Sequence, residues 1–300
     1  MLATNAAIVY CGQVNAPASA CSPRFSLILA TLGRTQQLER FLRALDAQTW
    51  RDFELIVVDQ NADDRLVAML ARYAAAFPVI HLRSPPGLSR ARNAGLGCAK
   101  GEIAGFPDDD CWYPEDLLAR VATWFDAHPR YDGVTGRAVD EAGDASTAPA
   151  LGRAGPVKRN TVWKQGVSIS IFLRRSVIGS VGGFNEELGV GSGTRWGSGE
   201  ETDYLLRALG HGFRLWYDPT LTVGHPSVMA ADAERSTRRA RLYGGGMGRV
   251  MRMHRFPPWF VLYQLLRPLL GCAWATLRLD LDRSRFYLAS FRARADGWRS

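Results

Sequence analysis

Short, continuous apolar runs alternate with segments of helical periodicity in the first half of the chain. Such runs are typical of strands that are buried on both faces of a sheet. The predicted strands are 25–30, 53–58, 79–82 and 101–106. The predicted helices are 36–45, 65–73, 89–99 and 114–128. This alternation predicts a parallel βαβ sheet that binds ligands at the carboxyl ends of its strands, and Thr35 is placed to cap the first helix.

The second half of the chain is less regular. Residues 140–160 are rich in Gly, Ala, Pro and Ser, which predicts a surface loop. The later elements that we predict are strand 167–173, a Gly-rich stretch 179–199, helix 201–209 and strand 213–217. The expected fold class is α/β, with a Rossmann-like, mostly parallel central sheet flanked by helices and a helical C-terminal extension.

Charge is distributed unevenly along the chain. The 300 residues carry a net charge of +8, and the pI is near 9.5. Residues 235–300 hold 14 arginines and three aspartates and so carry +11, which leaves the preceding 234 residues near −3. This balance excludes an acidic, solvating chain, and it makes anionic groups the expected partners of the C-terminal segment rather than of the whole protein.

Five scattered cysteines without a Cys-x-x-Cys pair exclude a disulfide framework and a zinc ribbon. A reduced, cytoplasmic setting fits this usage. We expect a loose N-terminal leader at 1–23, without the basic start of a signal peptide, a globular domain at 24–230 and a basic helical extension at 231–300.

Three adjacent carboxylates, Asp108, Asp109 and Asp110, follow a predicted strand. They repel one another, so such a triplet is tolerated in water or around a cation. Mg²⁺ and Mn²⁺ sites use one or two carboxylates and leave the other positions to water and substrate phosphates. The triplet predicts either a cation site that neutralises a leaving nucleoside diphosphate or an acidic loop that caps the next helix.

One further acidic residue and one acidic cluster are candidates for ligand binding or catalysis. Asp59 ends a predicted strand, where a carboxylate can accept a hydrogen bond from a base or a ribose hydroxyl, or can form a turn. Glu200, Glu201 and Asp203 crowd the first turn of a predicted helix. The helix dipole favours acidic residues there, and the position also suits a general base that takes a proton from an acceptor hydroxyl.

These candidates lie in six ordered segments of the chain. The segments are LILATLGR (27–34), FELIVVDQNADD (53–64), GLSRARNAGL (87–96), GFPDDDCWYPEDLL (105–118), VGGFNEEL (181–188) and GEETDYLLRAL (199–209). In order and spacing they resemble the family 2 glycosyltransferases of bacteria, over about two thirds of the chain. The resemblance implies a GT-A fold, a UDP- or dTDP-sugar donor, a divalent cation (Mg²⁺ or Mn²⁺) and an inverting single displacement.

The resemblance also implies roles for the donor-side residues. Thr31 and Arg34 would line the nucleotide pocket, Asp59 would contact the base, and Arg90 and Asn93 would face the donor.

The resemblance leaves alternatives at the acidic triplet. Asp108 and Asp110 match the family's D-x-D pattern, but an alignment on Trp112 shifts the match to Asp109 and Asp110. All three therefore remain candidates for the metal ligand, with Asp110 the first choice and Asp108 the second. Asp108 and Asp109 are also expected near the nucleotide sugar.

Glu201 matches the base position of the family, where many relatives have aspartate, and Glu200 and Asp203 remain alternatives. His225 resembles the histidine that completes the metal site in many GT-A enzymes, and a structural role is the alternative. Trp163 and Trp196 are expected on the acceptor side, stacked on a sugar ring, or else packed in the core.

The C-terminal region adds two expectations. Residues 235–255 combine dense arginine with a predicted hinge at 244–246, which would let the segment close over the donor diphosphate; a solvated basic face is the alternative. Residues 258–277 are apolar enough to span a bilayer, but Arg267 would cost roughly 2.5–3.5 kcal/mol there and Pro268 interrupts the helix.

The apolar residues of 258–277 fall on one helical face. They are Trp259, Leu262, Tyr263, Leu266, Leu270, Trp274 and Leu277. This pattern predicts a helix in a membrane interface, with 256–295 as a peripheral contact, or a helix packed on the enzyme's own core.

We therefore expect an inverting glycosyltransferase that moves a sugar from a nucleotide sugar to a hydroxyl of a glycan or lipid-linked acceptor. Its expected context is cell-surface polysaccharide or glycolipid synthesis, in the cytoplasm or at the inner face of the membrane. A nucleotidyltransferase or another nucleotide-sugar-binding protein is the alternative. A nucleic-acid-binding protein fits less well, because the predicted strand ends are acidic and no nucleic-acid module is recognised. We expect no nucleic-acid partner.

Overall fold

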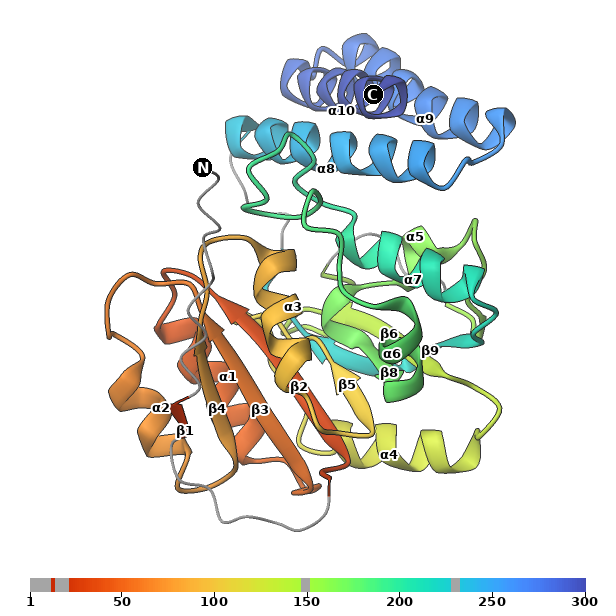
Figure 1. Ribbon diagram of the computed structural model, residues 1–300. Helices are drawn as coiled ribbons and strands as arrows, with labels where there is room; N and C mark the ends of the chain where they lie inside the picture. Colours follow the sequence, from red (N-terminus) through yellow and green to blue (C-terminus); the bar gives the residue numbers. More distant parts are fainter. Residues whose placement is uncertain (1–11, 14–21, 147–151, 228–232) are drawn as a thin grey trace, which may run out of the picture. The chain divides into compact units, whose positions relative to one another are not determined.

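The computed structural model describes residues 12–13, 22–146, 152–227 and 233–300, and the chain divides into two compact units (Figure 1). The first unit comprises Met1–Pro86, Arg90–Gly183 and Arg207–Ser227. The second comprises Gly87–Ser89, Phe184–Leu206 and Val228–Ser300. The expected leader lies outside the described residues except for 12–13 and 22–23.

The described strands form one nine-stranded sheet in the first unit, in the order β1-β4-β3-β2-β5-β8-β6-β9-β7. They are β1 (Gly12–Gln13), β2 (Phe25–Thr31), β3 (Phe53–Asp59), β4 (Val79–Arg83), β5 (Ile103–Gly105), β6 (Gly133–Val139), β7 (Gly155–Pro156), β8 (Ile171–Arg174) and β9 (Leu215–Gly224). The strands β4, β3, β2 and β5 run parallel, whereas β8 is antiparallel to both of its neighbours. The predicted α/β class with a mostly parallel central sheet is confirmed.

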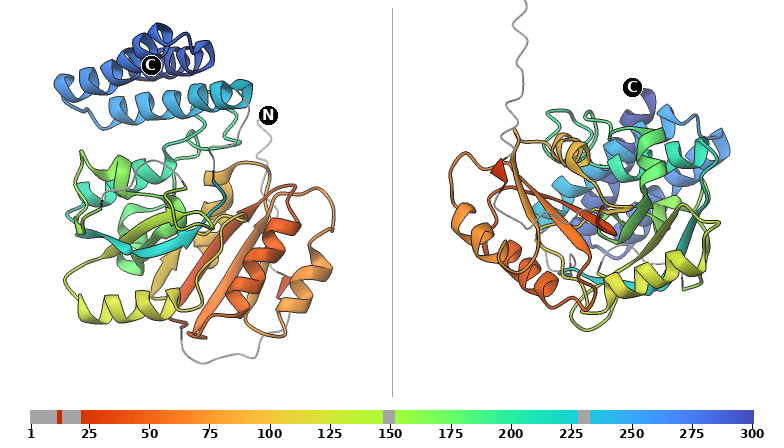
Figure 2. Two further views of the ribbon diagram at one scale, coloured as in Figure 1. Left: turned by 180° about the vertical axis from the view of Figure 1, so that it is seen from behind. Right: turned by 60° about the horizontal axis from the view of Figure 1, so that its bottom comes forward.

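Helices cover both faces of this sheet (Figure 2). Those of the first unit are α1 (Gln36–Asp46), α2 (Val67–Tyr73), α3 (Leu88–Cys98), α4 (Leu117–Ala127), α5 (Val162–Gln165) and α6 (Arg175–Val181). Helix α7 (Glu200–Gly210) begins in the second unit. Side chains of α1, α2 and α4 share one core cluster with β2 and β3, and α3 lies on the other face. A Cβ at Gly95 of α3 would lie 2.4 Å from Ile28 Cγ2, so the helix runs very close to β2.

The apolar spacing of α1 predicts its buried side correctly, but the cap is wrong. Leu38, Phe41, Leu42 and Leu45 are fully buried. Thr35 precedes the helix with a helical backbone (φ −118°, ψ −49°), and its side chain makes no capping hydrogen bond. A capping side chain needs the extended backbone of a true N-cap residue, which Thr35 does not have.

The structure differs from the predicted elements where glycine or serine dilutes the pattern. Strand β6 was not predicted, because Gly133 and Gly136 resemble loop residues. A Cβ at Gly136 would lie 2.0 Å from the carbonyl oxygen of Leu221, so the glycine permits close strand contact. The predicted strand 167–173 begins as a 3-10 turn at Ser168–Ser170, and only Ile171–Arg174 is extended.

The second unit contains three long C-terminal helices, α8 (Ala233–Met253), α9 (Pro258–Leu277) and α10 (Leu281–Arg299). The predicted hinge at 244–246 is wrong, because α8 is a continuous helix of 21 residues through these glycines. A Cβ at Gly246 would lie 2.1 Å from the Ser198 carbonyl oxygen, and one at Gly248 would lie 2.2 Å from that of Arg294. The glycines allow close packing instead of bending.

Candidate active site

The carboxyl ends of β2, β3 and β4 place three polar side chains in one row. The parallel register pairs Thr31 with Asp59, and Asp59 with Arg83. An isolated bridge between Ala30 and Asp108 brings the acidic triplet to the next position of the same edge. Parallel α/β sheets bind their ligands at this edge.

Asp59 is fully buried and holds the loop that follows β3. Its Oδ1 accepts hydrogen bonds from the backbone N–H (2.9 Å) and the amide Nδ2 (2.7 Å) of Asn61. Its Oδ2 lies 3.0 Å from His81 Nε2 and 3.2 Å from Arg83 Nη1. Burial alone would raise the pKa of Asp59, but these partners outweigh it and lower the pKa below its ordinary value.

The loop itself is tied back to β2 and β4. Asn61 accepts a hydrogen bond from the Gly33 N–H at 2.7 Å, and Arg83 donates to the carbonyl oxygens of Asn61 and Asp63 at 2.9 Å and 2.6 Å. Both oxygens of Asp59 are therefore used within the protein, where they shape the wall of the edge. A direct contact of Asp59 with a base stays a prediction.

The three aspartates of the triplet have different partners. Asp108 Oδ1 lies 3.1 Å from Nη2 of Arg92, which is 1% exposed. Asp109 accepts hydrogen bonds from Thr31 Oγ1 and from Arg34 Nη1, both at 2.7 Å. Burial raises the pKa of Asp109 above its ordinary value, although Thr31 and Arg34 act in the opposite direction. Asp108 and Asp109 are thus both engaged by side chains of the first unit.

Asp110 faces His225, with 3.6 Å between Oδ1 and Nε2, and it also accepts a hydrogen bond from Arg34 at 2.5 Å. Two hydrogen bonds of 2.9 Å between the backbones of Trp112 and Gly224 hold the two segments together. The other ring nitrogen of His225, Nδ1, lies 2.8 Å from the Pro226 carbonyl oxygen. A proton assigned to Nδ1 satisfies that carbonyl and turns the Nε2 lone pair toward Asp110.

This pair fits a divalent cation. A carboxylate oxygen and an imidazole lone pair are both ligands that Mn²⁺ and Mg²⁺ accept, and substrate phosphates and water commonly supply the remaining ligands. Within the described ranges no group of three or more His, Cys, Asp or Glu side chains is arranged to hold a metal. The protein's own share of a cation site would therefore be Asp110 and His225.

The candidate bases Glu200, Glu201 and Asp203 lie in the second unit, in the first turn of α7. Glu200 is 5% and Asp203 1% exposed, whereas Glu201 is partly exposed. Asp203 Oδ1 lies 2.8 Å from Nε2 of His254, just after α8, and the Glu200 carboxylate packs on Gly189. Glu201 is therefore the most accessible carboxylate of the three.

The remaining predicted residues are found in both units. Arg90 is exposed in the first turn of α3, and Asn93, in the same helix, lies against Gly183. Trp163 is partly buried in α5 of the first unit. Trp196 belongs to the second unit, where it is 8% exposed and packs on α8.

Three residues that hold the predicted ones in place were missed by the sequence reasoning. His81 and Arg83 lie on the same side of β4 and both contact Asp59. Arg92, inside the GLSRARNAGL segment, contacts Asp108 and donates to Ser168 Oγ at 2.5 Å. The available signal was the His-x-Arg alternation at the end of a predicted strand, which becomes informative only when the strand order is known.

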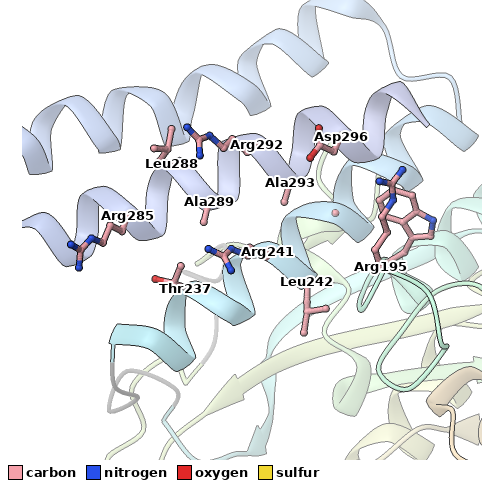
Figure 3. Close-up of a pocket in the computed structure, with 12 residues that line it drawn as sticks. Arg195, Thr237, Arg241, Leu242, Arg285, Leu288, Ala289, Arg292, Ala293 and Asp296 are labelled. Carbon is pink, nitrogen blue, oxygen red and sulfur yellow. The ribbon is translucent and has the colours of Figure 1, made fainter.

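The second unit also contains a cavity of about 480 Å³ between α8 and α10 (Figure 3). Its lining includes Arg195, Arg241, Arg285, Arg292 and Asp296. Four guanidinium groups against one carboxylate favour an anionic occupant. Among the predicted site residues, Trp196 lines it.

Comparison with known proteins places a segment of the chain in a family. Residues 26–174, which contain β2 to β8 and the acidic triplet, match the family model described as glycosyl transferase family 2. This segment belongs to glycosyl transferase family 2. The family 2 assignment confirms the resemblance seen in the sequence.

Curated glycosyltransferases match part of the chain. A stretch of 168 residues is 31% identical to a PGL/p-HBAD biosynthesis glycosyltransferase of Mycobacterium bovis, and it covers 55% of this chain and 64% of that relative. The chain thus spans less than two thirds of that relative's length. A stretch of 98 residues is 32% identical to the uncharacterized glycosyltransferase YfnE of Bacillus subtilis, over 32% of this chain and 25% of that protein.

Two solved structures share the fold. The TarS 1–349 fragment of S. aureus superposes with a TM-score of 0.60 at 16% identity, over 90% of this chain and 91% of that one. The mannosyltransferase PcManGT from Pyrobaculum calidifontis superposes with a TM-score of 0.61 at 17% identity, over 94% of this chain and 90% of that one. The expected GT-A fold with C-terminal helices is confirmed.

Proposed function

We propose that this glycosyltransferase moves a sugar from a nucleotide sugar of the UDP or dTDP type to a hydroxyl acceptor, with inversion and with the help of a divalent cation. The observation that carries the proposal is the short distance between Asp110 Oδ1 and His225 Nε2, 3.6 Å, at the carboxyl edge of the sheet. Related structures support it: TarS has been solved with UDP-GlcNAc, and PcManGT with GDP-Man and Mn²⁺.

Asp110 and His225 are the residues that would hold the cation. A bound divalent cation neutralises negative charge on the departing diphosphate. Arg34 donates to both Asp109 and Asp110 and keeps a side chain that is 44% exposed, so its guanidinium is placed to pair with a donor phosphate. Thr31, Asp108 and Asp109 are proposed to contact the donor at the carboxyl edge of the sheet. Arg90 and Asn93 of α3 are proposed to face the donor as well.

The nucleotide end of the donor would lie against the loop after β3. Asp59 orients that loop through Asn61, and the loop's backbone presents groups that can read the edge of a base. We assign Asp59 to this end of the donor, where its ionised form is stabilised by His81 and Arg83.

We assign the base to Glu201. Its carboxylate accepts the proton of the acceptor hydroxyl while the hydroxyl oxygen forms a bond to the anomeric carbon of the sugar. The bond from that carbon to the diphosphate breaks in the same step, and the nucleoside diphosphate leaves with the electron pair. Asp203 is fixed by His254, so in this proposal it positions α7.

The acceptor is proposed to be a glycan or a lipid-linked molecule in surface-polysaccharide or glycolipid synthesis, on the cytoplasmic side of the membrane. The support is the similarity to the PGL/p-HBAD biosynthesis glycosyltransferase, over 55% of this chain. Trp163 and Trp196 are the aromatic side chains proposed to stack on acceptor sugar rings.

The test is release of nucleoside diphosphate from UDP- and dTDP-sugars by the full chain, with Mn²⁺ or with EDTA. We expect EDTA to abolish release, and Asp110→Asn and His225→Ala to raise the Mn²⁺ concentration required by about 10- to 100-fold. Glu201→Gln should lower kcat by about 100- to 10,000-fold and leave donor binding unchanged.

The matched control is Glu115→Gln, an exposed carboxylate in the loop that follows the triplet, which should behave as the parent protein. Release that is insensitive to EDTA and to Asp110→Asn would contradict the cation site. Formation of pyrophosphate in place of nucleoside diphosphate would contradict the transferase assignment and support a nucleotidyltransferase.

A further inference from the structure

The outer face of α9 is apolar along its whole length. Seven large apolar side chains of this helix are between 43% and 79% exposed. They are Trp259, Leu262, Tyr263, Leu266, Leu270, Trp274 and Leu277. These residues are the ones that the sequence places on one helical face. Exposed faces of helices are normally polar, and a contiguous exposed apolar surface marks a site of interaction.

The opposite face of α9 is packed within the second unit, where α9 lies beside α10 (Figure 1). Phe260, Gln264 and Pro268 are buried. On α10, the ring of Tyr287 lies against Gly271, where a Cβ would approach it to 2.9 Å. The helix therefore already has its intramolecular partner, and the apolar face is what remains for something else to cover.

The position of arginines decides how α9 would meet a membrane. Among the described residues, α9 is the one helix with the length and mean hydropathy (1.3) needed to cross a bilayer. Arg267 near its middle opposes crossing, and so does α10, which would enter with it. The arginines of α10 are Arg283, Arg285, Arg292, Arg294 and Arg299. A 20-residue helix, about 30 Å long, is better placed in the plane of the surface.

Two arginine–aromatic pairs border the apolar face. The guanidinium carbon of Arg267 lies 5.8 Å from the ring centroid of Tyr263, and that of Arg278 lies 4.5 Å from the ring of Trp274. At membrane interfaces, aromatic rings lie at the level of the headgroups and arginines reach the lipid phosphates. Helix α9 contains no acidic residue, and 235–300 carry a net charge of +11.

We propose that α9 docks in the surface of a membrane that contains anionic lipid, with its apolar face at the boundary between acyl chains and headgroups. The proposal goes beyond the transfer reaction and does not rest on it, because lipid binding requires no donor. A second copy of the chain would instead bring two +11 segments and two arginine borders together, whereas anionic lipid supplies the opposite charge.

Flotation of the full chain with phosphatidylcholine vesicles containing about 30% phosphatidylglycerol tests the proposal. We expect the parent protein to float and Leu266→Gln/Leu270→Gln to bind at least about tenfold more weakly. The matched control is Val67→Gln/Val190→Gln, which makes the same polar change at residues that are 47% and 59% exposed elsewhere and should float as the parent does. Circular dichroism checks folding, and Leu270→Gln alone is the milder variant.

Two further measurements identify the contact. Arg267→Gln and Arg278→Gln should each weaken binding to anionic vesicles by about fivefold and leave binding to pure phosphatidylcholine nearly unchanged. Vesicles should shift the tryptophan emission of the parent to the blue, and Trp259→Phe/Trp274→Phe should remove most of that shift.

Three outcomes would overturn the proposal. The first is equal flotation of the parent and of Leu266→Gln/Leu270→Gln. The second is absence of flotation together with a dimer in light scattering that Leu270→Gln dissociates, which would assign the face to a second copy. The third is resistance of the bound protein to extraction at alkaline pH, which would indicate a spanning helix. Loss of glycosyl transfer with intact vesicle binding would leave this proposal standing and count only against the proposed reaction.

Discussion

At the scale of single residues, the candidate site combines groups that are held rigidly with groups that remain accessible. Asp59 is fully buried, its Oδ1 accepts two hydrogen bonds from Asn61, and its Oδ2 contacts His81 and Arg83, so it shapes the loop after β3. Arg34, in the same unit, keeps a side chain that is 44% exposed and can reach a ligand. Buried, fully paired polar networks rigidify a site, which lets the accessible groups act from fixed positions.

Asp59→Asn should destabilise the protein by about 3 kcal/mol at pH 7, because it removes a buried negative charge and leaves the guanidinium of Arg83 without it. The pKa of Asp59 is lowered in the folded protein, so its contribution is fully present above the ordinary pKa of an aspartate. The contribution is lost as the pH falls through the lowered pKa.

Urea unfolding of the parent and Asp59→Asn at pH 7, 5 and 3 measures this difference. It should be similar at pH 7 and 5 and smaller at pH 3. Asp64→Asn, with a side chain that is 89% exposed, is the control and should differ little from the parent. A difference that grows toward low pH would contradict the assignment of an ionised Asp59.

The sequence predicts the acidic triplet as a site but does not separate its members. Asp108 turns to Arg92 of α3, Asp109 to Thr31 of β2, and Asp110 to His225 after β9. These three partners are 16, 78 and more than 100 residues away, so only the folded topology assigns them. Spacing within one motif carries no such information.

At the scale of elements, the pattern of apolar residues predicts the strands and helices whose buried or apolar faces it marks without interruption. Strands β2 and β3, buried on both faces, and α9, with one apolar face, were predicted with nearly correct bounds. Strand β6 and the continuity of α8 were not, because the glycines in both resemble loop or hinge glycines in the sequence. Whether a glycine bends the chain or admits a neighbour depends on what packs against it.

Gly248→Ala tests that difference in α8. Its Cβ would lie 2.2 Å from the Arg294 carbonyl oxygen of α10, so we expect a loss of about 1–3 kcal/mol from overpacking. The matched control is Gly97→Ala in α3, where a Cβ meets nothing within 4 Å and helix propensity predicts a gain of up to about 1 kcal/mol. Urea unfolding followed by circular dichroism measures both, and equal effects would show that Gly248 is not a close-packing position.

At the scale of the whole molecule, the family assignment and the charge concern different parts of the chain. The family model ends at residue 174, before His225, the candidate base Glu201 and the C-terminal helices. The net charge of +11 resides in 235–300, while the remainder is near −3. The basic pI therefore describes the C-terminal helices and not the catalytic fold.

This division predicts how the protein responds to nucleic acid. A short DNA duplex should bind through the C-terminal arginines without sequence preference, and raising salt from about 50 to 200 mM should weaken binding by about a hundredfold. Donor turnover should change far less, because a nucleotide sugar presents only two phosphates. Arg238→Gln/Arg241→Gln, at two exposed positions of α8, should reduce the slope of log K against log salt by about 2. Electrophoretic mobility shifts measure these binding constants. Sequence-selective binding that persists at the higher salt would contradict this prediction and support a nucleic-acid-binding function.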